Sequence, residues 1–158
     1  MRCTDSFPSH RPCLHTCLHN PEKSLSLLLY TATPSVNQCA FNPSHGLSAK
    51  GCTPGSKAET CGELLTYCKS HGIHYQGYSP YGGAGGVGKL LGDPRLKKIA
   101  AAHGTGSSQV VLRWQWQLGI SVNPEAQQLQ YQEENLHFFN FTLSAAEMDV
   151  LNSWTTAL

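Results

Sequence analysis

A glycine-rich stretch that ends in a lysine is the first feature of this sequence that could do chemistry. Gly83, Gly88 and Lys89 satisfy the spacing G-x-x-x-x-G-K after an expected strand, which is most of a phosphate-binding loop. The next residue is Leu90, so the hydroxyl that would bind magnesium is absent, and no apolar strand ending in aspartate follows. Nucleoside-triphosphate binding between Gly83 and Lys89 therefore stays an alternative, and the glycine-rich residues 81–88 are expected to form a flexible loop.

Histidines and cysteines near the beginning of the chain form a second candidate site. Five of them fall close together: His10, Cys13, His15, Cys17 and His19. Their spacing matches no common zinc finger, and no second pair follows at the usual distance. Zinc binding stays an alternative, and no metal ligand is predicted.

The composition argues against several classes of protein. Charged residues make up 13% of the chain and the formal net charge is +1, against about 25% charged residues in typical domains, so no nucleic-acid partner is expected. The longest apolar run near the start, residues 25–30, is far below the roughly 20 residues of a membrane span, so no membrane contact is expected. The seven cysteines are odd in number and end at Cys68, which favours free thiols and a cytoplasmic location over a disulfide framework.

Strands and helices are expected to alternate in one domain over residues 25–158. Residues 1–24 contain three prolines and no hydrophobic periodicity, so an irregular or disordered tail is expected there. The expected strands are residues 36–41, 73–78 and 120–122. The expected helices are residues 23–32, 57–70, 93–104 with Asp93 as cap, 107–119 with Ser107 and Ser108 as cap, and 144–154 with Ser144 and Glu147 as a capping box. This alternation predicts parallel β/α units and the α/β fold class.

Three short segments stand in a particular order along the chain: PSVNQ at residues 34–38, YSP at residues 78–80, and VLRWQWQLGISVNP at residues 111–124. In that order they resemble the aldo-keto reductase family, and the resemblance extends over about residues 25–154. It implies an NAD(P)H-dependent oxidoreductase that reduces small aldehydes or ketones. Because 158 residues are too few for a closed (β/α)8 barrel, which takes about 200 or more, a partial TIM barrel is expected, with roughly the last three strands and their helices.

The resemblance implies a set of cofactor contacts. Gln38 matches a glutamine that hydrogen-bonds the nicotinamide carboxamide, and Tyr78 matches a tyrosine that stacks on the nicotinamide ring. Ser79, Tyr81 and Gly83 belong to a stretch that resembles the loop over the pyrophosphate. The alternatives without a cofactor are a polar cap at a strand end for Gln38, a half-buried strand tyrosine for Tyr78, and a mobile linker for the loop.

Two further positions match the adenine contacts of the family, and three others depart from its pattern. Glu134 and Asn135 occupy the adenine positions; the alternative is that both are solvated helix residues. Members that prefer NADPH carry a lysine, a serine and an arginine where this chain has Glu125, Ala126 and Tyr131. Three donors to the 2′-phosphate are thereby lost and Glu125 would repel it, so NADH is expected at least as well as NADPH.

No catalytic residue is predicted in this chain. The tyrosine, lysine, aspartate and histidine that the family uses to protonate the carbonyl lie on its first strands, and none of their motifs occurs here. We therefore expect a truncated form that is inactive in isolation. The alternative is a noncatalytic interaction protein, and the exposed strand edges of a partial barrel favour self-association in either case.

Overall fold

The computed structural model describes residues 33–45, 47 and 60–154. The expected tail at residues 1–24, the expected helix at 23–32 and the histidine and cysteine group at 10–19 lie outside these residues. Within them, no group of three or more metal-binding side chains gathers, and no helix has the length and apolar character needed to cross a membrane.

Three parallel strands form a sheet in the order β1 (Val36–Ala40), β2 (His74–Tyr78) and β3 (Ser121–Asn123). This confirms the α/β class, and each strand agrees with its expected position to within one residue at either end. Val36 pairs with His74 at the start of β2, and Tyr78 pairs with Asn123 at its end. The carboxyl ends of β2 and β3 therefore meet at one edge of the sheet.

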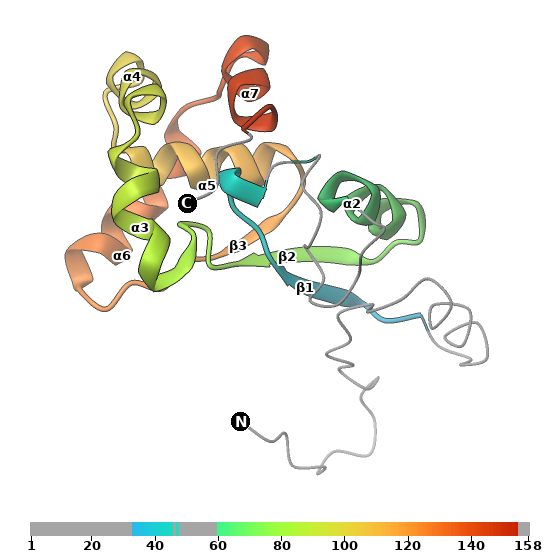
Figure 1. The fold of residues 1–158 in the computed structure, drawn as a ribbon. Coiled ribbons are helices and arrows are strands. Elements are labelled where there is room, and N and C mark those ends of the chain that lie inside the picture. Colours follow the sequence, from blue (N-terminus) through green and yellow to red (C-terminus); the bar gives the residue numbers. More distant parts are fainter. Residues whose placement is uncertain (1–32, 46, 48–59, 155–158) are drawn as a thin grey trace.

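The two faces of the sheet differ in character. Asn37 and Cys39 of β1 are buried, and so is Tyr75 of β2. Since side chains alternate along a strand, the neighbouring Gln38 and Tyr78 point to the opposite face. Figure 1 shows α2 (Cys61–Ser70) and α5 (Ser107–Gln117) on the same side of the sheet, and the Asn37 side chain contacts Cys68 of α2. The buried strand residues thus face the helices.

The remaining helical elements follow the strands in sequence. They are η1 (Pro43–His45), α3 (Gly83–Gly92), α4 (Pro94–Ala102), α6 (Leu129–Leu136), η2 (His137–Asn140) and α7 (Ala145–Asn152). The predicted capping box of Ser144 and Glu147 opens α7, and Asp93 caps α4 by accepting from the Arg95 amide. The part of the expected helix at residues 57–70 that the structure describes begins at Cys61, with Thr60 as its N-cap.

Two local expectations are wrong. A flexible loop was expected at residues 81–88, but residues 83–88 belong to the helix α3. Leu90 of this helix is completely buried in the core, and this packing outweighs the low helix propensity of glycine. The N-cap of α5 is Gly106 rather than the Ser107–Ser108 pair. The amide of Gly106 donates to Oε1 of Gln109 at 3.1 Å, so this side chain supplies the bond at the helix start.

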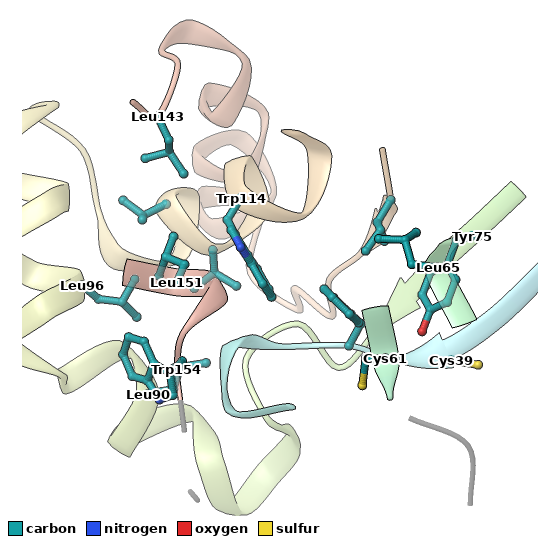
Figure 2. Close-up of a cluster of buried hydrophobic side chains, with 14 of the residues drawn as sticks. Cys39, Cys61, Leu65, Tyr75, Leu90, Leu96, Trp114, Leu143, Leu151 and Trp154 are labelled. Atoms are coloured by element: carbon teal, nitrogen blue, oxygen red, sulfur yellow. The ribbon is translucent and has the colours of Figure 1, made fainter. Parts of the chain in front are cut away.

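A continuous core joins the sheet to the helices. Phe41, just after β1, stacks on Trp114 of α5 with ring centroids 5.1 Å apart, and it meets Tyr75 edge to face at 5.8 Å. Figure 2 shows the core continuing past Trp114 to Leu151 and Trp154. Each such buried side chain contributes about 1.5–3 kcal/mol relative to an exposed position, which holds α5 against the sheet. Helix α7 packs against α5, where Nε1 of Trp114 donates to Oδ1 of Asn152 at 2.9 Å.

The described cysteines do not all agree with the expectation of free thiols. Cys39 and Cys68 are buried thiols that agree with the expectation, and burial raises the pKa of the Cys68 thiol although the Asn37 side chain lowers it in part. Cys61 is disulfide-bonded, so the expectation is wrong for this residue. Pairing depends on spatial proximity of two sulfur atoms, which spacing along the chain does not reveal.

Candidate functional site

A cleft of about 910 Å³ lies at the carboxyl ends of β2 and β3. In open parallel sheets this edge is where ligands bind, because the loops that follow the strands can diverge there. Three segments supply most of the lining: residues 78–83 after β2, residues 123–128 after β3, and the helix α6. The lining residues from these segments are Tyr78, Ser79, Pro80, Tyr81, Gly83, Asn123, Pro124, Glu125, Ala126, Gln127, Gln128, Tyr131, Glu134 and Asn135.

Six of the seven predicted cofactor residues line this one cleft: Tyr78, Ser79, Tyr81, Gly83, Glu134 and Asn135. Residues separated by more than fifty positions in the sequence are thus brought together. The seventh, Gln38, is not among the residues that line the cleft. It lies in β1, where its Nε2 donates to Oε1 of Gln76 at 2.8 Å.

Tyr78 is the last residue of β2 and stands beside Asn123, its partner in β3. Its side chain is 38% exposed, so one part of the ring is open to the cleft while the rest is covered by protein. A half-exposed aromatic ring at a strand end can stack against a planar ligand group. Asn123 was not predicted as a site residue, although its position directly after an expected strand is a signal that could have identified it.

A tight turn carries the chain from β2 into α3. Ser79 has a φ of +50°, and it is the only described residue other than glycine with a positive φ. The amide of Gly82 donates to the Ser79 carbonyl at 3.0 Å, which closes the turn. The turn places Gly83, the first residue of α3, at the cleft wall. Backbone N–H groups at a helix start carry partial positive charge and favour anionic ligand groups.

A hydrogen bond connects two of the predicted residues within the cleft. The hydroxyl of Tyr81, in the turn after β2, donates to Oδ1 of Asn135 on α6 at 3.2 Å. Burial raises the pKa of the Tyr81 hydroxyl well above its ordinary value, so it stays protonated and able to donate. Glu134, the neighbour of Asn135, accepts a hydrogen bond from Gln130 at 2.8 Å.

The charge of the cleft is unusual for a site that would bind a phosphorylated ligand. Two carboxylates, Glu125 and Glu134, belong to its lining, and no lysine or arginine does among the described residues. Glu125 is exposed and accepts a hydrogen bond from Gln127 at 3.2 Å. Carboxylates suit neutral hydroxyl groups such as those of a ribose, while they repel additional phosphate groups.

The triphosphate-binding alternative does not agree with the structure. Residues 83–89 lie within α3 instead of forming a loop that precedes a helix. The amides beyond the first turn of a helix are used by its own hydrogen bonds, so they cannot surround a phosphate. Lys89 is exposed, lies seven residues after Gly82, the N-cap of α3, and is not part of the cleft lining.

Comparison with known families identifies the fold to which this cleft belongs. Residues 31–155 match the model of the Aldo/keto reductase family. The chain belongs to this family. The alternation of strands and helices is accordingly part of an aldo-keto reductase barrel, and the expected partial (β/α)8 barrel is confirmed by solved structures.

Similar proteins include several oxidoreductases. The (1S)-1,7-diacetoxy-luvungin A aldo-keto reductase of Citrus sinensis is 35% identical over 131 residues, which cover 80% of this chain and 37% of that protein. Glyoxal reductase of Bacillus subtilis is 33% identical over 120 residues, or 76% of this chain and 37% of that protein. These are proteins that the chain resembles, and it spans well under half of their length.

Solved structures show the same partial coverage. The aldo/keto reductase of Brucella melitensis superimposes with a TM-score of 0.66 at 26% identity, over 85% of this chain and 44% of that one. A mutant form of Gox0644, in a crystal structure in complex with NADPH, superimposes with a TM-score of 0.67 at 26% identity, over 83% of this chain and 42% of that one. The chain therefore corresponds to part of the family's domain.

Proposed function

We propose that this chain supplies the cofactor-binding part of an NAD(P)H-dependent oxidoreductase that acts on small aldehydes or ketones. The observation that carries the proposal is that six residues matched to cofactor contacts line a single cleft at the carboxyl ends of parallel strands. Its volume of about 910 Å³ lies within the range of about 300–1,000 Å³ that is usual for small-molecule sites. Membership of the aldo/keto reductase family supports the same assignment.

The residues of the cleft suit the parts of a nicotinamide dinucleotide. Tyr78 would cover one face of the nicotinamide ring, leaving the other face for the hydride that the cofactor supplies when bound. The turn at Ser79 and the first amides of α3, next to Gly83, would hold the pyrophosphate. Glu134 and Asn135 would contact the adenine. Gln38 would reach the carboxamide from β1, which requires it to leave or share its bond with Gln76.

We propose further that NADH binds at least as well as NADPH. The cleft has no described cation for a 2′-phosphate, and Glu125 and Glu134 both belong to its lining. Ala126 and Tyr131, which also line it, offer no positive charge. The mutant form of Gox0644 was crystallised with NADPH, so this preference is a property proposed for the present chain.

Among the described residues, the cleft has no evident proton donor for a carbonyl oxygen. The Tyr78 ring would be occupied at the nicotinamide, and the Tyr81 hydroxyl already donates to Asn135. We therefore propose that this chain alone binds the cofactor without reducing a carbonyl substrate. Turnover of an aldehyde with either cofactor by the purified chain, abolished by Tyr78→Ala, would contradict this proposal.

Titration calorimetry of the purified chain with NADH and NADPH tests the proposed function. We expect NADH to bind and Tyr78→Ala to raise its Kd about two- to tenfold, as for the loss of one aromatic contact. Tyr67→Ala is the matched control, because Tyr67 is also 38% exposed but lies on α2, outside the cleft lining. A chain that binds neither cofactor, or an equal effect of both substitutions, would refute the proposal.

A second observation favours self-association. An apolar hollow of about 480 Å³ lies beside β3, which is an edge strand of the described sheet. Trp116, Leu136 and Phe139 border it and are 45%, 66% and 51% exposed. We propose that this surface pairs with another copy of the chain. Sedimentation velocity should show an oligomer that Phe139→Asp dissociates; a wild-type monomer at all concentrations would exclude it.

A further inference from the structure

The bond between Tyr81 and Asn135 joins two elements that both line the candidate cofactor cleft. Tyr81 belongs to the turn between β2 and α3, and Asn135 lies in the last turn of α6, 54 residues later. Both side chains are half-buried and both line the cleft. The Tyr81 ring also packs against the hydrophobic core, and this packing restricts the position of its hydroxyl.

This bond determines which atoms of Asn135 remain for a ligand. A side-chain amide has one acceptor oxygen with two lone pairs and one donor nitrogen with two hydrogens. Tyr81 occupies one lone pair of Oδ1, and no other side-chain hydrogen bond of Asn135 occurs within the part of the chain that the structure describes. The Nδ2 hydrogens are therefore left for a ligand, and the amide cannot turn over without losing the Tyr81 bond.

We propose that Tyr81 is a positioning residue of the cleft, which acts through Asn135 and fixes its amide so that Nδ2 donates to a ring nitrogen of a bound purine nucleotide. The inference rests on the proposed cofactor site, in which Asn135 contacts adenine. Adenine suits an amide held in this way, because it presents a ring-nitrogen acceptor beside an exocyclic amino donor, and the second lone pair of Oδ1 can accept from that donor.

Calorimetric titration of the two halves of the cofactor tests this role. AMP contains the adenine, whereas nicotinamide mononucleotide does not, so only AMP depends on Asn135. In the full chain, Tyr81→Phe removes only the hydroxyl. We expect it to raise the Kd for AMP and for NADH about two- to tenfold, the effect of losing one hydrogen bond's contribution. The Kd for nicotinamide mononucleotide should not change.

The double substitution separates positioning from general support of the fold. If Tyr81 acts through Asn135, then Tyr81→Phe should have no further effect on AMP binding when Asn135→Ala is already present. Asn135→Asp is the second variant. It keeps an oxygen for Tyr81 and replaces the donor nitrogen, so we expect it to lose AMP binding while it retains the melting temperature. Tyr67→Phe, on the exposed side of α2, is the control for removal of a tyrosine hydroxyl.

Each outcome distinguishes the inference from the proposed function. Equal Kd values for AMP in wild type and Tyr81→Phe would overturn the inference alone. The inference would also be overturned if Tyr81→Phe raised the Kd for AMP and for nicotinamide mononucleotide alike, or if the effects of Tyr81→Phe and Asn135→Ala on AMP binding were additive. Tyr81 would then support the fold in general. A wild-type chain that binds none of the three ligands would overturn both the proposed function and the inference.

Discussion

The buried side chain of Gln115 donates through Nε2 to the carbonyl oxygen of Phe41, at 2.8 Å. Gln115 lies on α5 and Phe41 directly follows β1, so the bond joins the helix layer to the end of a strand 74 residues away in sequence. Phe41 also donates its amide to the Tyr78 carbonyl at 3.1 Å. A polar side chain in the core thus connects α5, through Phe41, to the strand end at which the cleft begins.

Gln115→Leu should destabilise the protein by about 1–3 kcal/mol. Leucine has a similar size and fits an apolar core, but it leaves the Phe41 carbonyl without this donor in a buried place. The free energy of unfolding from urea denaturation measures the effect. Gln130→Leu is the control, because Gln130 is exposed on α6 and should change stability by no more than about 0.5 kcal/mol. Equal effects of the two substitutions would contradict the importance of the buried bond.

Two glycine substitutions should change stability in opposite directions. A Cβ at Gly77 of β2 would lie 3.0 Å from Oε1 of Gln115 and 3.2 Å from Cγ2 of Ile120, so Gly77→Ala should cost about 1–3 kcal/mol through overpacking. A Cβ at Gly88 would meet nothing within 4 Å. Because Gly88 lies inside α3, Gly88→Ala should stabilise the protein by about 0.5–1 kcal/mol.

The Gly88 variant also tests whether residues 83–92 form a helix in solution. In a flexible loop, alanine would bring no gain in helix propensity, and the melting temperature would stay constant or fall. Circular dichroism of the two variants measures both the helix content and the melting temperature. A lower melting temperature for Gly88→Ala would argue against α3.

The strands and most described helices were predicted from local signals, whereas α3 and α6 were not. Asp93 before Pro94, and Ser144 before Glu147, are local caps whose effects depend on neighbouring residues, and the structure places both where they were expected. The helix from Gly83 depends instead on the burial of Leu90 by residues distant in sequence. A run of glycines in the sequence indicates a flexible backbone, but it does not indicate the surface against which the segment will pack.

In the candidate site, too, some features could be predicted from the sequence and others could not. Family resemblance predicted Tyr78 and Asn135 as cofactor contacts, and the structure brings them into one cleft, although their contact with a cofactor stays a proposal. The hydrogen bond between Tyr81 and Asn135 could not be predicted, because it depends on how α6 packs beside the turn after β2. The pairing of Gln38 with Gln76 likewise follows from strand register, which the spacing of motifs does not determine.

Glu125→Lys should shift cofactor preference toward NADPH. The substitution replaces a negative charge at the cleft wall with a positive one, which attracts the 2′-phosphate. Because Glu125 is exposed and screened by solvent, we expect the ratio of the Kd for NADH to that for NADPH to rise only about three- to tenfold. Glu133→Lys makes the same charge change on α6 outside the cleft lining. A similar shift in both variants would indicate a general effect of net charge.

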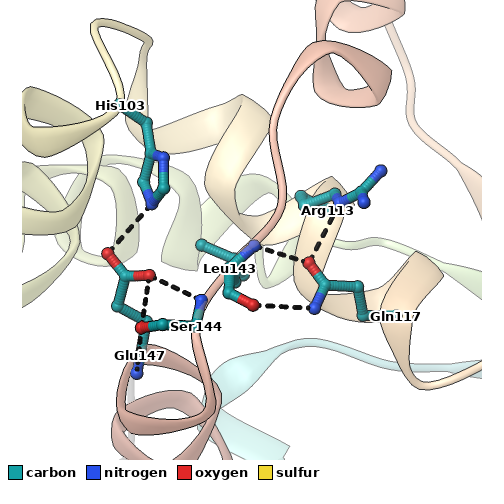
Figure 3. A network of polar contacts seen from close by, with 6 residues as sticks. All are labelled: His103, Arg113, Gln117, Leu143, Ser144 and Glu147. Carbon is teal, nitrogen blue, oxygen red and sulfur yellow. Dashed lines mark hydrogen bonds and ion pairs between the residues drawn. The ribbon is translucent and has the colours of Figure 1, made fainter.

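The carboxylate of Glu147 links two parts of the helix layer, as Figure 3 shows. It accepts from Nε2 of His103, at the end of α4, at 2.9 Å, and from the amide and hydroxyl of Ser144 at 2.8 Å each. Desolvation by burial raises the pKa of Glu147, but the hydrogen bonds from Ser144 and His103 outweigh it and hold the pKa below its ordinary value. The ionised carboxylate is therefore stabilised by folding.

A lowered pKa in the folded state predicts how stability depends on pH. Above the unfolded pKa of about 4.3 the carboxylate contributes its full stabilisation, and this contribution is lost as the pH falls through the folded pKa. Glu147→Gln keeps a side chain that can complete a capping box but removes the charge. At pH 7 we expect the variant to be less stable by about 1 kcal/mol, with the difference shrinking between about pH 5 and pH 3.

Urea denaturation at several pH values across this range measures the difference in the free energy of unfolding. Asp149→Asn, at an exposed position of α7, controls for removal of a carboxylate from the same helix. A difference between wild type and Glu147→Gln that does not change with pH would show that the charge of Glu147 contributes nothing.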